Sequence, residues 1–181
     1  MEKPIPLAQI PATADNLFEA LFNEHWNRLH RILSRFTADP DEAEDLCMET
    51  YLRLRSHLSS MRTHDNLAGW LYRTATNLGL NALRATHRRS QYERSAFEVL
   101  PTTFDNPADE VESRQECEMV RRVLAEIKPR EAQILLLRAS GLSYQELAVA
   151  CQVSPSSVGT LLARAEREFE KRYQARYGGY R

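Results

Sequence analysis

Glycine, proline and cysteine are scarce in this sequence, which has six glycines, eight prolines and three cysteines among 181 residues. Because glycine and proline interrupt helices and dominate turns, their scarcity favours a helical protein. Cys47, Cys117 and Cys151 stand far apart, without a C-x-x-C pair or a cysteine and histidine cluster. This spacing argues against a zinc site or a disulfide framework, so we expect buried, reduced thiols.

Long hydrophobic runs are also missing. No stretch approaches the roughly 18 consecutive apolar residues that a membrane-spanning helix needs. The first residues, MEKPIPLAQIPATAD, carry prolines where a secretory signal would need an uninterrupted apolar core. The sequence therefore predicts a cytoplasmic protein with no membrane insertion.

The sequence also lacks the usual catalytic and cofactor-binding motifs. The sequence shows no glycine-rich phosphate loop, no metal-ligand cluster, no cysteine and histidine dyad at helical spacing and no paired carboxylates that would face one cleft. The five histidines are scattered, at positions 25, 30, 57, 64 and 87. We therefore expect a protein that is not an enzyme and that holds no metal or cofactor.

An excess of positive charge is absent too, because the net charge is −1. The charge is uneven: residues 90–112 carry six acids and one cation, whereas residues 164–181 carry six cations and three acids. Affinity for bulk DNA comes mainly from lysines and arginines that displace counterions. If this chain acts on DNA, it needs a partner that helps it to bind.

What the sequence does contain is helical periodicity, and its most informative stretch is residues 65–89. One narrow face of this expected helix is apolar, with Leu67, Leu71, Ala75, Leu78 and Ala82. The opposite face is basic and rich in amides, with Arg73, Asn77, Asn81, Arg84 and Arg88, and Trp70 projects beside it. Such a surface suits nucleic acid, because cations neutralise phosphates and an aromatic ring stacks on a base. The alternative is an ordinary surface helix with Trp70 buried against a neighbour.

The preceding helix should run over residues 40–58. Asp39 and Pro40 are a strong helix start, and the first half of the helix is acidic, with Asp41, Glu42, Asp45 and Glu49. Two interpretations stay open for these acids. They stabilise the positive end of the helix dipole, or they form a docking face for a basic partner.

The C-terminal part carries a helix-turn-helix pattern. Ala148 stands where the two helices approach closely, and Val158 packs between them. Gln152 stands in the turn, at a position where glycine is favoured. The second helix, from Pro155, would offer a polar face to the DNA major groove, with Ser156, Ser157, Thr160, Arg164 and Arg167. An ordinary helical hairpin is the alternative.

The remaining helices are expected at residues 16–36, 109–127, 129–139 and 143–151, and residues 90–111 break the helical period. Because a linker of about twenty residues is long for one compact domain, we expect two domains. The predicted fold is all-α, with two small helical domains joined by a flexible acidic linker. Its parts are a disordered extension over 1–14, a bundle over 15–89, the linker over 90–111 and a helix-turn-helix domain over 112–176.

Three ordered motifs together resemble a known family. EAEDLCMETYLRL (42–54), GWLYRTATNLGLNALRATHRR (69–89) and YQELAVACQVSPSSVGTLLARA (144–165) look like the extracytoplasmic-function (ECF) group of bacterial sigma factors. The resemblance covers about residues 17–172. It implies that the first domain is sigma region 2 and the second is sigma region 4.

The resemblance also implies partners and site residues. Asp45, Leu46 and Glu49 match the motif that docks on the clamp helices of the largest subunit of core RNA polymerase, and region 4 would meet the polymerase flap. The minus-ten promoter element would be read and opened by the loop 61–65 and by Trp70, Arg73, Asn77, Asn81, Arg84 and Arg88. The minus-thirty-five element would be read as duplex by Ser154, Ser156, Ser157, Thr160, Arg164 and Arg167. An anti-sigma factor is a further expected partner and could hold the protein at the membrane.

The sequence departs from the family pattern at a few positions. Met48 stands where the docking motif usually has glutamine, and Gly159 and Leu161 fall where the recognition helix commonly carries lysine or arginine. A second hypothesis is a stand-alone helix-turn-helix regulator in which residues 1–90 form a sensor or dimerisation bundle. Its near-neutral charge argues against binding duplex DNA unaided.

Overall fold

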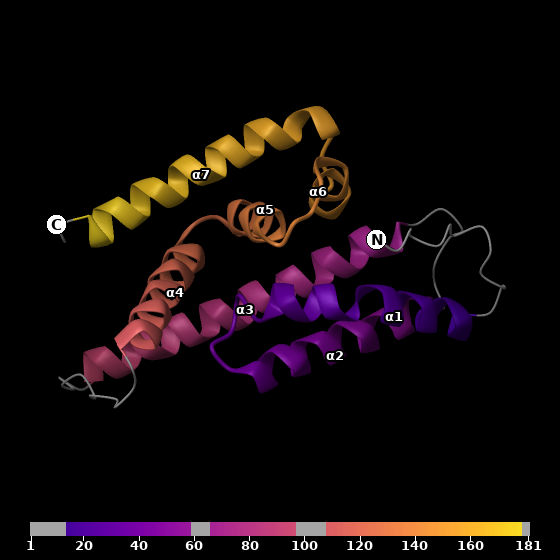
Figure 1. Cartoon of the computed structure of the whole chain (residues 1–181), viewed down its shortest axis with the longest axis horizontal. Coiled ribbons are helices and arrows are strands. Elements are labelled where there is room, and N and C mark those ends of the chain that lie inside the picture. The colour runs from indigo at the N-terminus through magenta and orange to yellow at the C-terminus, as the bar shows by residue number, and fades with distance from the viewer. Residues whose placement is uncertain (1–13, 59–65, 97–107, 179–181) are drawn as a thin grey trace.

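The computed structural model describes residues 14–58, 66–96 and 108–178 (Figure 1). These residues form helices and connecting turns, without a strand in the described ranges, which confirms the predicted all-α class. The helices are α1 (Ala14–Leu33), α2 (Pro40–Leu58), α3 (Leu67–Ala96), α4 (Ala108–Glu126), α5 (Pro129–Ala139), α6 (Tyr144–Cys151) and α7 (Pro155–Tyr177). The expected disordered extension lies outside the described residues, except for Ala14, which begins α1.

Helices α1, α2 and the first part of α3 form the N-terminal bundle. Its core is aliphatic and almost completely buried, with Leu29, Ile32, Leu33, Phe36, Leu54 and Leu71. Tyr51 also belongs to this core: it is only 2% exposed, and its hydroxyl donates to the Leu21 carbonyl at 3.2 Å. A phenol can be buried here because its one polar group has a partner.

Local sequence signals set most helix ends as expected. Asp39 Oδ1 accepts from the Asp41 amide at 3.0 Å and Pro40 opens α2. Ser143 and Glu146 form a reciprocal capping box at the start of α6, and Gly141, at φ +84°, follows the end of α5. These groups satisfy amides and carbonyls that would otherwise lack partners.

Two helices differ most from their predicted bounds. Helix α1 begins at Ala14 and ends at Leu33, and residues 34–36 form a turn instead of a further helical turn. Helix α3 continues to Ala96, seven residues beyond the expected end at Arg89. Residues 90–96, SQYERSA, contain no glycine or proline to stop it. The gap between α3 and α4 is therefore 97–107, which lies outside the described residues.

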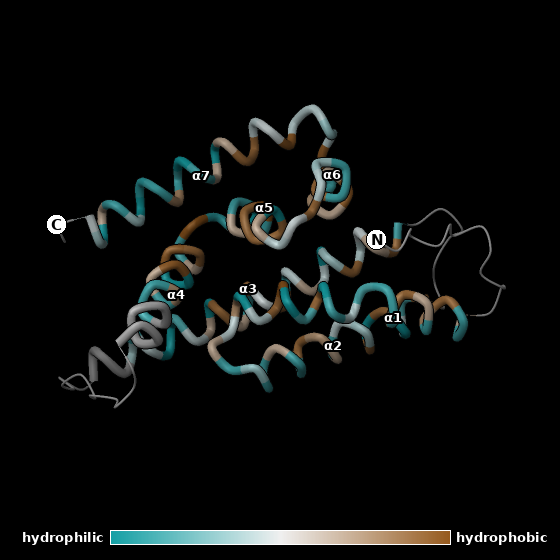
Figure 2. The backbone as a smooth tube through the Cα atoms, in the orientation of Figure 1, coloured by the Kyte–Doolittle hydropathy of each residue, from teal (hydrophilic) through white to brown (hydrophobic). Residues whose placement is uncertain are grey.

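Helix α3 is the centre of the whole molecule. It contacts α1 and α2 on one side and α4, α5 and α6 on another (Figure 1), and the buried side chains form one continuous core. The sequence predicted one apolar face on α3, but Tyr72, Thr76 and Leu83 are also buried. Figure 2 shows hydrophobic and hydrophilic stretches alternating along the helices, as expected when each is buried on part of its surface. The two expected domains thus pack directly on each other.

Candidate functional site

Helix α2 presents acidic and apolar side chains together on its exposed side. Asp45 is exposed, and Met48 and Leu52 are 47% and 63% exposed. Glu49 accepts a hydrogen bond from Arg53 Nη2 at 2.6 Å, which holds its carboxylate on the surface. We call Asp45, Met48, Glu49 and Leu52 the acidic α2 face. Leu46, predicted with this group, is half-buried and packs against the core.

The predicted polar residues of α3 divide into two sets. Asn77, Asn81 and Arg88 are exposed, whereas Trp70, Arg73 and Arg84 are half-buried. The surface expected to meet nucleic acid is therefore partly covered in this structure. The reason is the second buried face of α3, which the C-terminal domain covers.

Arg84 shows this most directly. Its Nε donates to the Ala125 carbonyl at 3.2 Å and its Nη2 donates to the Ile127 carbonyl at 2.9 Å. These carbonyls belong to the end of α4 and the connection to α5, where a cation is favoured by the helix dipole. Burial, together with the neighbouring charge of Arg88, lowers the pKa of Arg84 below its usual value. Arg84 therefore joins the two domains in this structure.

Trp70 lies flat against a histidine that the sequence did not single out. The rings of His57 and Trp70 are stacked, with centroids 4.7 Å apart and an interplanar angle of 12°. A cavity of about 410 Å³ adjoins them and is lined by His57, Asn66, Trp70, Arg73, Val149 and Gln152. The N-terminal and C-terminal domains both contribute to this cavity, whose lining combines aromatic, amide and guanidinium groups.

A polar network links α1, α3 and α6. Arg28 Nη1 lies 2.7 Å from Glu146 Oε1, and it also reaches the Tyr72 hydroxyl at 3.4 Å. The Tyr72 hydroxyl in turn lies 3.1 Å from His25 Nδ1. Burial raises the pKa of Tyr72 and lowers that of His25. Burial opposes ionisation of Glu146, but its bonds with Arg28 and Ser143 hold the pKa of the carboxyl below its usual value.

The helix-turn-helix pattern is confirmed in α6 and α7. Ala148 and Val158 are 4% and 0% exposed, and Gln152 takes the left-handed turn conformation with φ 53° and ψ 54°. Gly159 has open space around it, since an added Cβ would meet Tyr144 only at 3.9 Å. A side chain would fit at this position. Because glycine stands there, this part of the helix surface carries neither a side chain nor a charge.

The predicted recognition residues lie along the exposed side of α7. Ser154, Ser156, Thr160, Arg164 and Arg167 are exposed, and Ser157 is half-buried. Ser154 Oγ lies 2.6 Å from Ser157 Oγ, and Arg167 Nε donates to the Ala163 carbonyl at 3.1 Å. Arg164 Nε lies 3.3 Å from Oε1 of Glu131, a carboxylate that is almost fully buried. The helix presents hydroxyls and guanidinium groups together, as major-groove reading requires.

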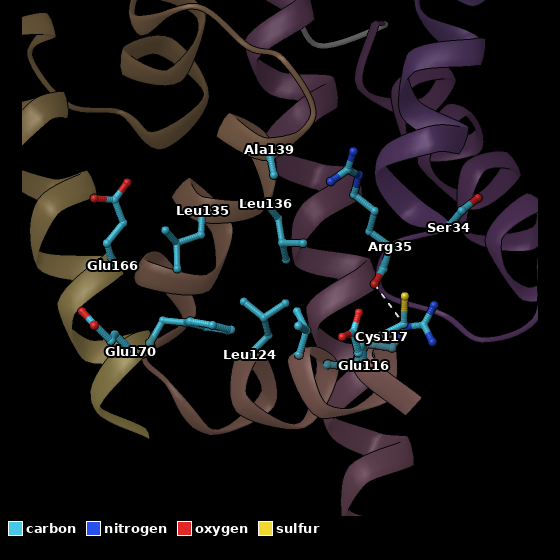
Figure 3. A pocket seen from close by; sticks show the side chains of 13 residues that line it. Ser34, Arg35, Glu116, Cys117, Leu124, Leu135, Leu136, Ala139, Glu166 and Glu170 are labelled. Carbon is cyan, nitrogen blue, oxygen red and sulfur yellow. Dashed lines mark hydrogen bonds between the residues drawn. The ribbon is translucent and has the colours of Figure 1, made fainter. Parts of the chain in front are cut away.

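A groove that the sequence did not predict lies between α4, α5, α7 and the turn that follows α1 (Figure 3). Its volume is about 690 Å³. Its walls are mainly apolar and its rim is charged, and the lining side chains include Val120, Leu124, Leu135, Leu136 and Phe169, with Arg35, Glu166 and Glu170. The periodicity of each helix indicated its apolar residues, but not that four segments would leave a groove between them.

The cysteines differ from one another. Cys47 and Cys151 are buried, as expected, and burial raises the pKa of their thiols to about 12 and about 11. Cys117 is exposed, which contradicts the expectation for that residue, because it lies at the border of the groove in Figure 3 and is not part of the core. Within the described residues there is no group of side chains arranged to hold a metal ion. None of the helices there combines the length and apolarity that crossing a membrane requires.

These features define the class as an all-α protein of two packed helical domains, with a helix-turn-helix in the second domain and an amide-rich surface on α3. Comparison with known proteins identifies the family. Residues 21–89 match the family model of sigma-70 region 2, and residues 117–169 match that of sigma-70 region 4. The chain is 31% identical to RNA polymerase sigma factor YlaC of Bacillus subtilis, over 84% of this chain and 90% of YlaC. It is 28% identical to ECF sigma factor SigE of Mycolicibacterium smegmatis, over 92% of this chain and 65% of SigE.

Two solved structures have the same fold. CnrH, in complex with the cytosolic domain of CnrY, gives a TM-score of 0.58 with 19% identity over 93% of this chain and 94% of that chain. The sigma factor RpoE of Bartonella quintana, in complex with the anti-sigma factor NepR, gives 0.51 with 19% identity over 85% and 94%. The chain belongs to the ECF group of the sigma-70 family. It is therefore an RNA polymerase sigma factor, and the resemblance found in its motifs is confirmed.

Proposed function

We propose that this sigma factor docks on core RNA polymerase through the acidic α2 face and has no catalytic activity of its own. The observation that carries this proposal is the exposure of Met48 and Leu52 beside Asp45. Large apolar side chains on a surface favour a contact with another protein, and the flanking carboxylates favour a partner with basic residues. Methionine at 48 replaces a polar contact with an adaptable apolar one.

The minus-ten element would be held by α3. Asn77, Asn81 and Arg88 are exposed in the packed chain and can donate to bases and phosphates. Trp70 and Arg73 lie at the cavity beside His57, where an unstacked base could stack on the indole. The loop 61–65, proposed to form part of the same pocket, lies outside the described residues.

The minus-thirty-five element would be read by α7 in the major groove. Thr160, Arg164 and Arg167 supply one hydroxyl and two guanidinium groups along the exposed side. Because this helix has few cations, its binding to DNA alone should be weak. Polymerase would make both contacts effective by holding the two domains at a fixed separation. Region 4 would also meet the polymerase flap.

An anti-sigma factor is the proposed regulator, and both solved structures above contain a second protein of that kind or a cytosolic partner domain. The apolar groove between α4, α5 and α7 could accept an amphipathic helix of such a partner. We place the protein in the cytoplasm, where polymerase and promoter DNA are found. A stand-alone regulator is disfavoured because both domains match sigma regions.

The proposal is tested by replacing Asp45 with arginine. Asp45→Arg places a cation on the acidic α2 face and should weaken binding to core polymerase by at least about tenfold. Glu19→Arg is the matched control, since Glu19 is an exposed acid on α1 and its replacement changes the net charge equally. Unchanged polymerase binding by a folded Asp45→Arg variant would remove this face from the docking site.

A further inference from the structure

Glu131, in the first turn of α5, is an acid buried in the second domain. It is only 7% exposed, and within the described residues its Oε2 has no hydrogen-bond partner. Burying a carboxylate is unfavourable unless other groups compensate it, so packing alone does not account for this residue. Its neighbours are cations, because Lys128, Arg130 and Arg164 line the same small cavity, whose volume is about 150 Å³.

The charged partner of Glu131 stands on the recognition helix. Arg164 Nε lies 3.3 Å from Glu131 Oε1, and the Arg164 side chain is 59% exposed. The ion pair therefore has its carboxylate in the interior of the domain and its guanidinium at the surface of α7. Because the acid lies nearest to Nε, the two Nη nitrogens are left for a contact outside the chain, and neither has a hydrogen-bond partner among the residues that the structure describes.

The rest of α7 makes Arg164 more important for reading DNA. The helix begins at Pro155, and Arg164 is its first cation. Gly159 supplies no side chain and Leu161 no hydrogen-bond donor, and Arg167 donates its Nε to a carbonyl of its own helix at 3.1 Å. The surface up to Arg164 therefore offers hydroxyls and a single guanidinium, so any strong base contact there depends on how that guanidinium is held.

We propose that Glu131 is a positioning residue for Arg164, and that the held guanidinium reads one guanine of the minus-thirty-five element. Two nitrogens of a guanidinium can bind O6 and N7 of a guanine in the major groove. Glu131 is too deeply buried to touch DNA, and it acts by restricting Arg164 to an orientation in which both Nη nitrogens point outward. The inference rests on the minus-thirty-five role proposed above for Arg164.

The expected size follows from the freedom that an unheld arginine would lose on binding. Immobilising a long side chain weakens binding by a factor of about two to ten, and a side chain that is already held loses less. A bidentate contact between arginine and guanine favours the correct base by a factor of about 5 to 150. We therefore expect the wild type to prefer guanine about thirtyfold at one position, and a chain without the Glu131 carboxylate to prefer it only about sixfold.

Three variants separate positioning from packing. Glu131→Leu removes the carboxylate and fills its volume beside Ile134 and Leu161, so the fold should be kept. Glu131→Gln keeps an acceptor without the charge and should have an intermediate preference, since hydrogen bonds to a charged group are stronger. Glu168→Gln is the matched control, because Glu168 Oε1 pairs with Arg172 Nε at 2.9 Å further along the same helix, outside the proposed reading residues.

Each full-length variant is used to select from a pool of duplex DNA with a randomised stretch, and the bound duplexes are sequenced. The duplex preferred by the wild type and its single-base variants are then titrated by fluorescence anisotropy, and melting is followed by circular dichroism. We expect the guanine preference to fall in Glu131→Leu about fivefold, to fall less in Glu131→Gln and to stay unchanged in Glu168→Gln, with no loss of melting temperature. An unchanged preference in Glu131→Leu, a wild type without any base preference, or equally weakened binding to every sequence would overturn the inference.

Arg164→Ala distinguishes this failure from failure of the proposed function. If Arg164→Ala loses the guanine preference while Glu131→Leu keeps it, Arg164 reads DNA but Glu131 does not position it. If Arg164→Ala keeps the wild-type preference, the minus-thirty-five role of Arg164 itself is wrong and the inference loses its basis.

Discussion

Replacing Arg84 with alanine should loosen the contact between the two domains. In the structure its guanidinium donates to two carbonyls, at 3.2 Å and 2.9 Å, at the end of α4. Hydrogen bonds from a charged group contribute roughly 1.5–3 kcal/mol, and a cation near a helix C-terminus contributes roughly 0.3–1 kcal/mol. Because Arg84 is half-buried, the lower part of this range applies, and we expect a loss of about 2 kcal/mol in the free energy of unfolding.

Arg88 provides a matched control on the same helix. It is the same residue type one turn further along α3, but it is exposed. Arg88→Ala should change the free energy of unfolding by no more than about 0.5 kcal/mol. Arg84→Lys should be intermediate, because an ammonium on a flexible chain cannot reproduce the planar fork of two donors.

The assay is urea unfolding followed by circular dichroism, together with thermal melting. A loss of about 2 kcal/mol corresponds to roughly 4–8 °C in the melting temperature of a chain this long. Equal stability of Arg84→Ala and Arg88→Ala would refute the reasoning, because the two carbonyl bonds would then contribute nothing to the packed state. The same pair tested in holoenzyme would show whether Arg84 also contacts DNA once the domains separate.

Three further predictions concern the thiols, an ion pair and the recognition helix. Only Cys117 should be alkylated near pH 8 in the native protein, because burial raises the pKa of the other two thiols; mass spectrometry that found three modified cysteines would contradict this. The pKa of Glu146 in the folded chain lies below its ordinary value of 4.5. Its stabilising ion pair with Arg28 is therefore complete above about pH 4.5 and is lost as the pH falls through the pKa of the folded state. Small-angle scattering should show expansion on acidification in the wild type, and Glu146→Gln should lack this dependence. Arg164→Ala should weaken binding to minus-thirty-five duplex roughly tenfold in mobility-shift assays, whereas a change confined to promoter opening would reassign Arg164.

The helices were predictable because their signals are local. Pro40, Ser143 and Gly141 mark helix ends through bonds or backbone angles within a few residues, and Pro40 opens α2 as predicted. The continuation of α3 to Ala96 was missed because the sequence lost its apolar period there. A solvent-exposed helix does not need that period to stay helical, provided that glycine and proline are absent.

The arrangement of the two domains was not predictable from the sequence. Thr76 and Gln133 are both polar, and neither marks itself as part of a core; they become buried because each satisfies the other at 2.7 Å. Gly69 likewise has meaning only beside Val149, which is eighty positions away in the chain. The recognition of Asp45, Asn81 and Arg164 as site residues came from their pattern and stays a prediction, since their partners are other molecules.

Start-site mapping with reconstituted polymerase tests the central claim most directly. Purified core polymerase from the source bacterium is mixed with this chain and genomic DNA, and the ends of the transcripts are sequenced. We predict a defined set of starts, each with a shared element near minus ten and another near minus thirty-five, that appear with the wild type and are lost with Asp45→Arg. Transcripts whose starts are the same with and without the chain would contradict the account.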